Sequence, residues 1–374
     1  MESRETDVCV IGGGVLGAAI AFSLSQLGKR VIVVERARPA AEASGVAMGW
    51  VLVHFANAAH FGCNRSGEFP PFLMRLMRSA LDAYDDLDAE IKRESEYVQT
   101  GAMSLIYSTA ERTAHEERAK LLVDHGIDVQ VLSRDAVLAR EPELAGDFLG
   151  ATLCPREGAI TSPKLVAALL ERVLRMNGEL LANTTVTGMI RDGARIVGVE
   201  TSAGPIRAGA VVNAAGLAAT EVGRLAGIEV PMFPARGQQV LLDGAGDLLH
   251  GPILCHAPAR PMPGGRILLG GHPEQTGYDN RVTFAGIGQI VAEWSQVLPK
   301  CADLTFISAN AGLRPLPKDG FPILGAVPGV PGLYLASLHY GVTLAPLVGR
   351  LMAELITTGT SSVPLEPFSI ARFG

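Results

Sequence analysis

Hydrophobic residues in the first part of the chain fall into short continuous runs separated by a helical stretch. Residues 7–11 and 30–34 are almost entirely apolar, which is typical of parallel strands covered on both faces. Residues 15–27 lie between them with the composition of a buried helix, and Gly28 ends that helix. The pattern therefore predicts a strand–helix–strand unit near the start of the chain.

The same patterns predict further elements along the chain. Helices are predicted at residues 70–93, 110–126, 162–177 and 283–298. Strands are predicted at residues 179–182, 210–213 and 303–309 and in several short segments between 228 and 309. Ser162-Pro163 starts a helix with a capping serine followed by proline, and Asp192-Gly193 separates two apolar runs as a hairpin turn does.

Strand–helix signals lie at both ends and in the middle of the chain, with strand-rich segments between them. This alternation predicts an α/β (α+β) fold, in which a Rossmann-like, dinucleotide-binding domain is interleaved with a mixed β-sheet substrate domain. The expected ranges are 1–75, 150–225 and 310–374 for the discontinuous dinucleotide-binding domain, and 76–149 and 226–309 for the substrate domain.

A glycine motif of the form G-x-G-x-x-G joins the first predicted strand to the first helix. Gly12 permits a tight turn, Gly14 lets the backbone approach a pyrophosphate, and Gly17 allows the helix to pack close to the strand. Glu35 ends the second strand, where a carboxylate can accept hydrogen bonds from a ribose. The motif predicts a bound dinucleotide, and these residues alone leave NAD and FAD both open.

Composition narrows the class of protein. The chain has 374 residues, 48% of them hydrophobic, and a net charge of −6, so it offers no basic surface for nucleic acid. The polar N-terminus is unlike a signal peptide, and the longest apolar stretch is too short and too rich in glycine to span a membrane. The cysteines are dispersed without a C-x-x-C pair: Cys9, Cys63, Cys154, Cys255 and Cys301. We therefore expect a cytoplasmic protein with reduced thiols and no metal site.

The C-terminal part of the chain contains two notable segments. "GLRPLPKDGFPILG" covers residues 312–325, and an amphipathic helix follows within residues 332–356. That helix begins at Gly341-Val342-Thr343, where free backbone N–H groups suit the negative charge of a reduced flavin.

Four segments together resemble the FAD-dependent D-amino acid oxidase superfamily. They are the N-terminal glycine motif, "VVNAAG" at residues 211–216, "GLRPLPKDGFPILG", and "HYGVTLAPLVGRLMAELI" at residues 339–356. The superfamily includes glycine and sarcosine oxidases, and the "HYGVTLAP" ending is most similar to its opine and D-hydroxyproline dehydrogenase subunits. The resemblance implies FAD, bound noncovalently because Gly312 lies where covalent members carry a cysteine and Cys301 is well upstream.

The resemblance also implies the cofactor-binding residues. Gly12, Gly14, Val15, Leu16 and Gly17 would hold the pyrophosphate, Glu35 and Arg36 the adenosine ribose, Ser44 and Gly45 the loop towards the flavin, Val186 the adenine, Ala215 and Gly216 the pyrophosphate–ribose region, and Gly341, Val342 and Thr343 the pyrimidine edge of the flavin.

Four residues are candidates for the catalytic site. Arg314 matches the family's arginine that clamps a substrate carboxylate, and its planar fork suits bidentate binding. His339 and Tyr340 directly precede the flavin-edge glycine, and His54 follows the loop towards the flavin. Packing of the loop or the core is the alternative role for these last three.

The expected reaction is oxidation of the C–N bond of a D-amino acid, an N-substituted amino acid such as an opine or sarcosine, or a cyclic imino acid. A hydride would pass from Cα–H to flavin N5, and the imine would then hydrolyse. The C-terminal ending favours a dehydrogenase that passes electrons to a partner subunit or carrier. The alternatives are an oxygen-using glycine or sarcosine-type oxidase, a NAD-dependent Rossmann dehydrogenase, or a non-catalytic dinucleotide-binding subunit.

Overall fold

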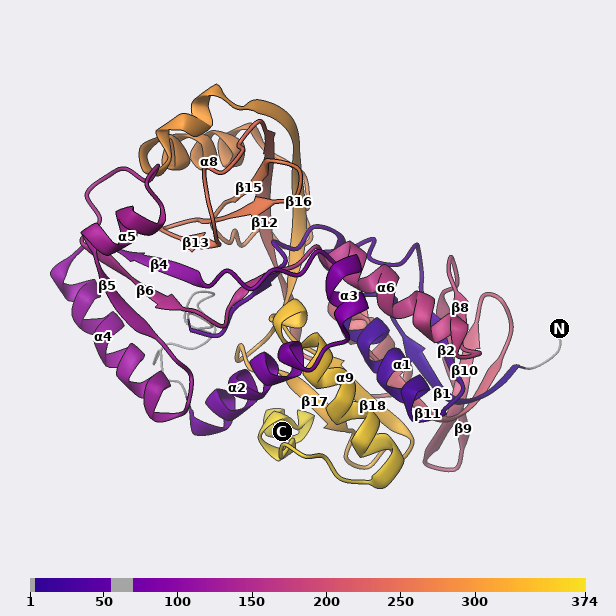
Figure 1. Ribbon diagram of the computed structural model, residues 1–374. Coiled ribbons are helices and arrows are strands. Elements are labelled where there is room, and N and C mark those ends of the chain that lie inside the picture. Colours follow the sequence, from indigo (N-terminus) through magenta and orange to yellow (C-terminus); the bar gives the residue numbers. More distant parts are fainter. Residues whose placement is uncertain (1–3, 55–69) are drawn as a thin grey trace.

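The computed structural model describes residues 4–54 and 70–374, which build two β-sheets with helices packed on their faces (Figure 1). Residues 1–3 and Cys63 lie outside this described part. The first sheet, with α1, α6 and α9, forms the lobe that contains both termini of the described chain. The second sheet, with α4, α5 and α8, forms the other lobe, and the long strands β12 and β16 extend between the two.

The first sheet has a Rossmann-like core of five parallel strands. In spatial order these are β8, β2, β1, β11 and β18, so the chain order reverses between β1 and β11. Ligands bind at such a reversal, outside the carboxyl ends of the strands. The strands of this sheet are β1 (Arg4–Ile11), β2 (Val31–Val34), β8 (Glu179–Leu181), β9 (Val186–Asp192), β10 (Arg195–Thr201), β11 (Ile206–Asn213), β17 (Ile323–Ala326) and β18 (Leu333–Ser337). The hairpin predicted at Asp192-Gly193 is confirmed, because β9 and β10 form an antiparallel pair.

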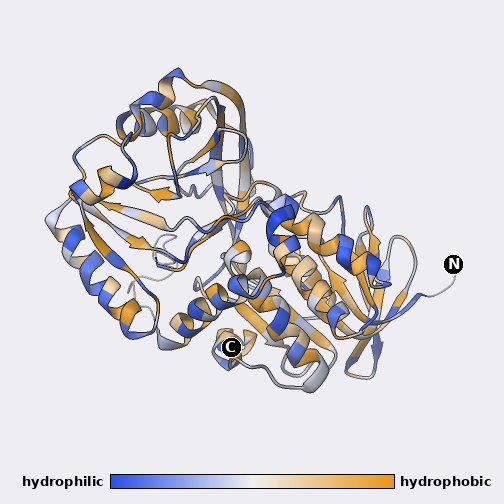
Figure 2. Ribbon diagram, viewed as in Figure 1, coloured by the Kyte–Doolittle hydropathy of each residue, from blue (hydrophilic) through white to orange (hydrophobic). Residues whose placement is uncertain are grey.

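The continuous apolar runs of β1 and β2 follow from burial on both sides. Val8 and Val10 belong to the core shared with α1 and α9, whereas Cys9 and Ile11 belong to the core on the opposite face. Figure 2 shows the hydrophobic residues concentrated in these central strands and helices, with hydrophilic residues along α4 at the edge of the molecule. An alternating pattern would have left one face of the strand polar.

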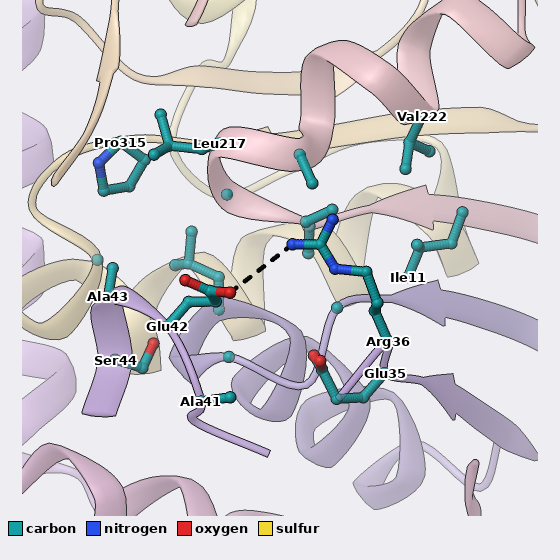
Figure 3. A pocket seen from close by; sticks show the side chains of 18 of the residues that line it. Ile11, Glu35, Arg36, Ala41, Glu42, Ala43, Ser44, Leu217, Val222 and Pro315 are labelled. Atoms are coloured by element: carbon teal, nitrogen blue, oxygen red, sulfur yellow. Dashed lines mark ion pairs between the residues drawn. The ribbon is translucent and has the colours of Figure 1, made fainter. Parts of the chain in front are cut away.

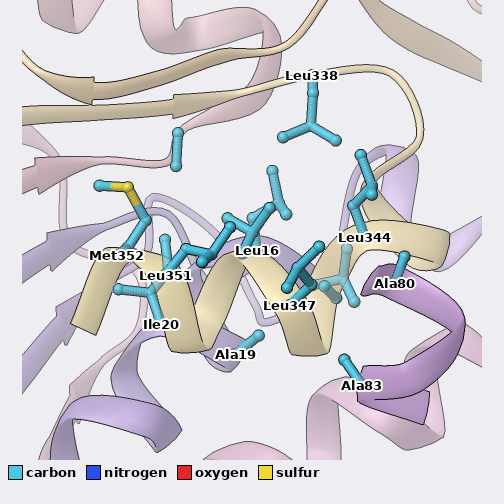
Figure 4. Close-up of a cluster of buried hydrophobic side chains, with 14 of the residues drawn as sticks. Leu16, Ala19, Ile20, Ala80, Ala83, Leu338, Leu344, Leu347, Leu351 and Met352 are labelled. Atoms are coloured by element: carbon cyan, nitrogen blue, oxygen red, sulfur yellow. The ribbon is translucent and has the colours of Figure 1, made fainter. Parts of the chain in front are cut away.

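Helices α1 and α9 cross closely on one face of the first sheet. A Cβ at Gly349 of α9 would lie 2.6 Å from the carbonyl oxygen of Ala19 in α1, so only glycine permits this approach. Leucine, isoleucine and alanine side chains fill the contact, as Figure 4 shows for Leu16, Ala19 and Ile20 of α1, Leu344, Leu347 and Leu351 of α9, and Ala80 and Ala83 of α2.

Pro346 lies inside α9 and has no N–H to donate to the carbonyl of Val342. The hydroxyl of Tyr84, from α2, donates to that carbonyl over 2.7 Å. Tyr84 is fully buried, and burial raises its pKa well above the usual value. A side chain from a distant helix thus replaces the hydrogen bond that proline removes at the start of α9.

The second sheet is mixed and has eight strands in the order β16, β12, β15, β14, β13, β4, β6, β5. Its strands are β4 (Ala102–Ile106), β5 (Gln130–Ser133), β6 (Gly150–Cys154), β12 (Met232–Asp243), β13 (Ile253–Leu254), β14 (Pro258–Met262), β15 (Arg266–Gly270) and β16 (Thr305–Pro317). The strand predicted at 303–309 therefore extends through the "GLRPLP" segment. A separate small ribbon pairs β3 (Trp50–Val51) with β7 (Gly158–Ala159). The predicted domain ranges stay a prediction. Strand β6 lies in the range predicted for the dinucleotide-binding domain, but its hydrogen bonds to β4 make it part of the second sheet.

The helices are α1 (Val15–Gln26), α2 (Pro71–Asp85), α3 (Ala89–Glu94), α4 (Thr109–Asp124), α5 (Arg134–Arg140), α6 (Ser162–Arg175), α7 (Ala219–Leu225), α8 (Phe284–Val297) and α9 (Gly341–Thr358). The helices predicted near 110–126, 162–177 and 283–298 are confirmed. The single helix predicted at 70–93 is wrong: it is divided into α2 and α3. Asp88 causes the break, because its carboxylate accepts hydrogen bonds from the N–H groups of Glu90 and Ile91 and so caps a new helix.

Candidate active site

A cavity of about 560 Å³ lies where the order of the parallel strands reverses. Its walls come from the carboxyl ends of β1 and β11, from the loop after β2, and from the N-terminus of α9. The predicted cofactor residues that line it are Gly12, Gly14, Val15, Leu16, Glu35, Arg36, Ser44, Val186, Ala215, Gly216, Gly341 and Val342. The structure thus brings residues from five distant segments to one site.

Two glycines of the motif are required by close backbone contacts. Gly12 has φ +112, and a Cβ there would lie 2.6 Å from the carbonyl oxygen of Ala214. Gly17 does not line the cavity, but a Cβ there would lie 1.9 Å from the carbonyl oxygen of Gly12. Side chains at either position would push the helix away from the strand, and the anion-binding end of α1 would move with it.

Glu35 is held in place by backbone N–H groups. Its two carboxylate oxygens accept hydrogen bonds from Gly13 N and Ala37 N, each over 2.7 Å. A carboxylate has about four acceptor sites, so both oxygens keep capacity for the hydroxyls of a ribose. Glu35 borders the cavity, which agrees with the role expected for it.

Arg36 lies at the mouth of this cavity. Its guanidinium is half exposed and lies 3.7 Å from a carboxylate oxygen of Glu42 and 3.7 Å from one of Glu221. Figure 3 shows the pair with Glu42 above Glu35 and near Ser44. Exposed pairs at this distance contribute little stability, so the Arg36 side chain can reorient towards a ligand at low cost.

Ser44 and its neighbour Gly45 shape the loop after β2. The hydroxyl oxygen of Ser44 accepts a hydrogen bond of 3.0 Å from Val15 N in the first turn of α1. Gly45 lies outside the cavity wall, and a Cβ there would lie 2.1 Å from the carbonyl oxygen of Ala40. Gly45 therefore serves the packing of the loop.

A second cavity, of about 260 Å³, adjoins the first and shares Leu313, His339 and Val342 with it. It lies between the second sheet and the start of α9. Thr343 lines this second cavity and not the first, and its hydroxyl donates to Trp50 O over 3.1 Å. The position next to a dinucleotide cavity is suited to a small substrate.

Arg314 lies in the wall of the second cavity, on strand β16. Its guanidinium lies across Gly237 of the neighbouring strand, where a Cβ would come within 2.8 Å of Nη2. Burial lowers the pKa of Arg314 to about 10, with opposing effects from Tyr340 and Glu274. The group therefore stays positive at neutral pH and presents its planar fork to the cavity.

His339 and Tyr340 also line the second cavity. Their rings meet edge to face with centroids 4.8 Å apart. Burial, with the charge of Arg314 adding to it, lowers the pKa of His339 to about 3. His339 is therefore neutral at physiological pH, so it is a hydrogen-bonding group and not a cation.

The structure does not bring His54 to the wall of either cavity. Its side chain is buried, and Nδ1 lies 2.5 Å from a carboxylate oxygen of Glu157. The other oxygen of Glu157 accepts hydrogen bonds from Val53 N over 2.5 Å and His54 N over 2.6 Å. This network fixes the backbone after β3, which points to a positioning role for His54.

His54 and Glu157 also form, with Cys154, a buried group whose ligand atoms lie within 4.8 Å of one another. Burial raises the pKa of the Cys154 thiol well above its usual range. Cys9, Cys255 and Cys301 are likewise free thiols. No helix within residues 4–54 and 70–374 is long and apolar enough to cross a membrane.

Several polar residues of the second cavity were not predicted. They are His256 in the loop before β14, His272 just after β15, and Gln239 in the middle of β12. His272 lies 3.1 Å from Glu293, and His256 stacks on Tyr107 with centroids 4.6 Å apart. No motif surrounds these residues, and only the pairing of the strands brings them together. Among the described residues that line this cavity there is one arginine, Arg314, and no aspartate or glutamate.

The first cavity fits a dinucleotide with a flavin at the α9 end. Glycines remove side chains where a pyrophosphate would lie, and α1 and α9 both begin at the cavity wall. Gly341 and Val342, at the positive end of α9, border the first cavity, and Val342 also borders the second cavity, which contains Arg314. The fold and site together define a dinucleotide-dependent oxidoreductase with a second, smaller pocket beside the dinucleotide cavity.

Comparison with known proteins gives the family. Residues 7–355 match the model of the FAD dependent oxidoreductase family (DAO), and the chain belongs to this family. It is 29% identical to glycine oxidase of Geobacillus kaustophilus over 98% of this chain and 97% of that protein. The crystal structure of that enzyme superposes with a TM-score of 0.88 over 99% of both chains.

Two further relatives come from Pseudomonas aeruginosa. The chain is 30% identical to a glycine oxidase over 97% of this chain and 98% of that protein. It is also 30% identical to hydrogen cyanide synthase subunit HcnC over 99% of this chain and 97% of that protein. The resemblance to the D-amino acid oxidase superfamily is therefore confirmed, and so are the fold class and the FAD cofactor. The protein is an FAD-dependent oxidoreductase that acts on CH–NH or CH–NH2 groups.

Proposed function

We propose that the protein is an amino acid oxidase of the glycine oxidase type. It would oxidise the C–N bond of a small amino acid or N-substituted amino acid and pass the electrons to oxygen, with hydrogen peroxide as a product. The observation that carries this proposal is Arg314, whose guanidinium forms part of a small cavity that opens onto the start of α9. Glycine oxidases among the relatives support an oxidase over the dehydrogenase that the "HYGVTLAP" ending suggested.

Arg314 would orient the substrate through its α-carboxylate. A bidentate pair fixes the carboxylate in plane and so fixes the direction of the Cα–H bond. Gly237 makes room for the guanidinium, because any side chain there would collide with it. When bound, FAD supplies the acceptor for the two electrons that leave the C–H bond next to nitrogen.

The cavity would also select the protonation state of the amine. An amine must be neutral to release electrons towards the α-carbon, and a positive environment lowers the pKa of a nearby ammonium group. Arg314 is positive, and the described lining residues include no carboxylate that would stabilise an ammonium ion. His339, held neutral, could accept a hydrogen bond from the amine or donate one to the carboxylate.

The start of α9 would stabilise the charge that develops during the reaction. The first N–H groups of a helix have no partner within the helix, and the dipole places partial positive charge there. Gly341 and Val342 are the first residues of α9 and border the first cavity, and Val342 borders the second cavity as well. Their backbone is therefore suited to a negative charge on the neighbouring ring, as the sequence predicts. HcnC is named as a synthase subunit, which is consistent with a partner subunit for this chain as well.

The test is an anaerobic titration of the purified holoprotein with glycine, sarcosine, D-alanine and D-proline. We expect one or more of them to bleach the flavin band, and air to restore the band with one peroxide per turnover. Arg314→Met should keep its flavin band but resist bleaching at the same concentrations. Bleaching that oxygen does not reverse, but an artificial electron acceptor does, would replace the oxidase with a dehydrogenase.

A further inference from the structure

Arg260 is a buried cation without a counterion in the described structure. Its side chain is only 3% exposed, and its Nε has no hydrogen-bond partner. No hydrogen bond or ion pair of this guanidinium is found within residues 4–54 and 70–374. Burial lowers its pKa to about 10, so the group is still positive at neutral pH.

Burying an unpaired charge is unfavourable, and proteins rarely keep one without a function. The carboxylate that influences Arg260 electrostatically is that of Glu96. Glu96 is already engaged, because it accepts a hydrogen bond of 2.6 Å from the hydroxyl of Thr161 and pairs with the ammonium group of Lys164. Arg260 therefore has unused donors that a negatively charged ligand could satisfy.

The position of Arg260 connects it to the second cavity. It lies two residues after Pro258 on β14, and side chains two apart on a strand share one face. Pro258 lines the second cavity, so Arg260 belongs to the face of the sheet that the cavity covers. Gly49 lines the cavity too, and a Cβ at Gly49 would lie 3.0 Å from Nη2 of Arg260. At this point only the backbone of a glycine separates the guanidinium from the cavity.

Arg314 lines this cavity, whereas Arg260 lies behind its wall at Gly49 and is not itself a lining residue. Arg314 is on β16, and Arg260 is three strands away on β14, across β12 and β15. His256 and His272 line the wall on the side of β14 and β15, and Nε2 of His272 lies 3.1 Å from a carboxylate oxygen of Glu293. No carboxylate among the described lining residues opposes an anion there.

We propose that Arg260 creates a second anion subsite at the Gly49 wall of the substrate cavity. The preferred substrate is then an amino acid with a second carboxylate, either an acidic D-amino acid or an N-carboxyalkyl amino acid. Arg314 would bind the α-carboxylate next to the flavin, and Arg260 would bind the distal one. This inference rests on the proposed function, since it takes the second cavity as the amino acid site.

The experiment measures binding without turnover. Diglycolate and methoxyacetate share an ether core that replaces the oxidisable amine, but only diglycolate has two carboxylates. Glutarate and butyrate form a second such pair with longer spacing. The dissociation constant of each is measured from the change in flavin absorbance of the holoprotein. We expect at least one diacid to bind about 10- to 100-fold more tightly than its matched monoacid, as for hydrogen bonds to a charged group.

The variants are Arg260→Met and Arg266→Met. Arg260→Met should abolish the preference for the diacid, leave monoacid binding unchanged, and keep or raise the melting temperature, because methionine fits a buried site without a charge. Arg266→Met removes the same charge from the same hairpin, where its Nε bonds only to Pro263 O, and should keep the preference. If Arg260→Met does not retain FAD, Arg260→Lys and the wild-type pairs decide the question.

Three outcomes would contradict the proposed anion subsite. They are equal binding of diacids and monoacids by the wild type, a preference that survives in Arg260→Met, or a lower melting temperature in that variant with no change in selectivity. The proposed function fails in a different way, when no amino acid bleaches the flavin at all. When both proposals hold, the last step is to compare two substrates. Bleaching by D-glutamate would indicate an acidic D-amino acid, and bleaching by iminodiacetate would indicate an N-carboxyalkyl amino acid.

Discussion

The two cavities of this protein recognise their ligands by different means. The first is built mainly from backbone: glycines, helix N-termini and a glutamate whose own position is fixed by backbone N–H groups. The second is built from side chains that reach in from separate strands, with arginine and histidine but no acidic residue among the described lining residues. Backbone recognition depends on a short continuous segment, whereas side-chain recognition depends on which strands lie side by side.

This difference has a consequence for tolerance to substitution. In the first cavity a single added methyl group meets a backbone carbonyl that cannot move away. In the second cavity a changed arginine or histidine side chain leaves the backbone in place and alters charge or shape only, whereas a Cβ at Gly49 would meet the carbonyl oxygen of Ile160. We therefore expect substitutions in the first cavity to affect folding and FAD content together, and those in the second to affect substrate alone.

The largest expected effect on activity is that of Arg314→Met. Removing one partner of a buried charge pair should lower kcat/KM by a factor equivalent to about 2–5 kcal/mol. Flavin content and melting temperature should change little, which steady-state kinetics and absorbance spectra can check. Arg281→Met, at a side chain that is 81% exposed, is the matched loss of charge and should leave kcat/KM unchanged. Equal kinetics in the wild type and Arg314→Met would remove this residue from the site.

Gly17→Ala tests the backbone side of the comparison. Its Cβ would lie 1.9 Å from the carbonyl oxygen of Gly12, so α1 must shift from β1 and the protein should lose FAD. Overpacking of this kind costs about 1–3 kcal/mol of the free energy of unfolding. Gly188→Ala is the control, because its Cβ would meet Glu200 at an ordinary 3.5 Å. Full FAD occupancy in both variants would show that the close approach is not required.

Tyr84→Phe should act on the first cavity from a distance. It removes the hydroxyl that donates to Val342 O, the carbonyl that Pro346 leaves without a donor. An unsatisfied buried carbonyl costs about 1–3 kcal/mol, and it would loosen the start of α9 where the flavin is expected. Tyr97→Phe is a matched control, because the buried hydroxyl of Tyr97 has no partner in the described structure. Denaturation curves and FAD dissociation constants should therefore separate the two variants.

The smallest expected effect concerns acid stability and His339. The unfolded chain protonates this histidine near its usual value of 6.5, whereas the folded protein holds it neutral down to about pH 3. Its contribution to stability is therefore present above pH 6.5 and is lost as the pH falls from 6.5 towards 3, at about 1.4 kcal/mol per pH unit. His339→Asn should show a shallower loss of stability over this range in urea denaturation at several pH values. Parallel curves for the two proteins would indicate that His339 is already protonated in the fold.

The sequence supported some predictions better than others for a physical reason. The glycine motif, Glu35 and the start of α9 are local, because each consists of residues close together in the chain whose backbone geometry follows from their own types. Arg314 was found through its segment and not through its contacts. The helix predicted at 70–93 failed at Asp88, because a single side-chain cap outweighed a continuing apolar pattern.

The sequence by itself determined the strand–helix–strand unit, the dinucleotide site and the N-termini of α1 and α9 that border this site. These features depend on local patterns of glycine and apolar residues. Only the tertiary structure decided that His54 pairs with Glu157 away from the cavities, that Tyr84 replaces the bond lost at Pro346, and that Arg260 lies behind Gly49. These contacts join residues far apart in sequence. They are set by strand register and helix packing, which no single segment of the chain encodes.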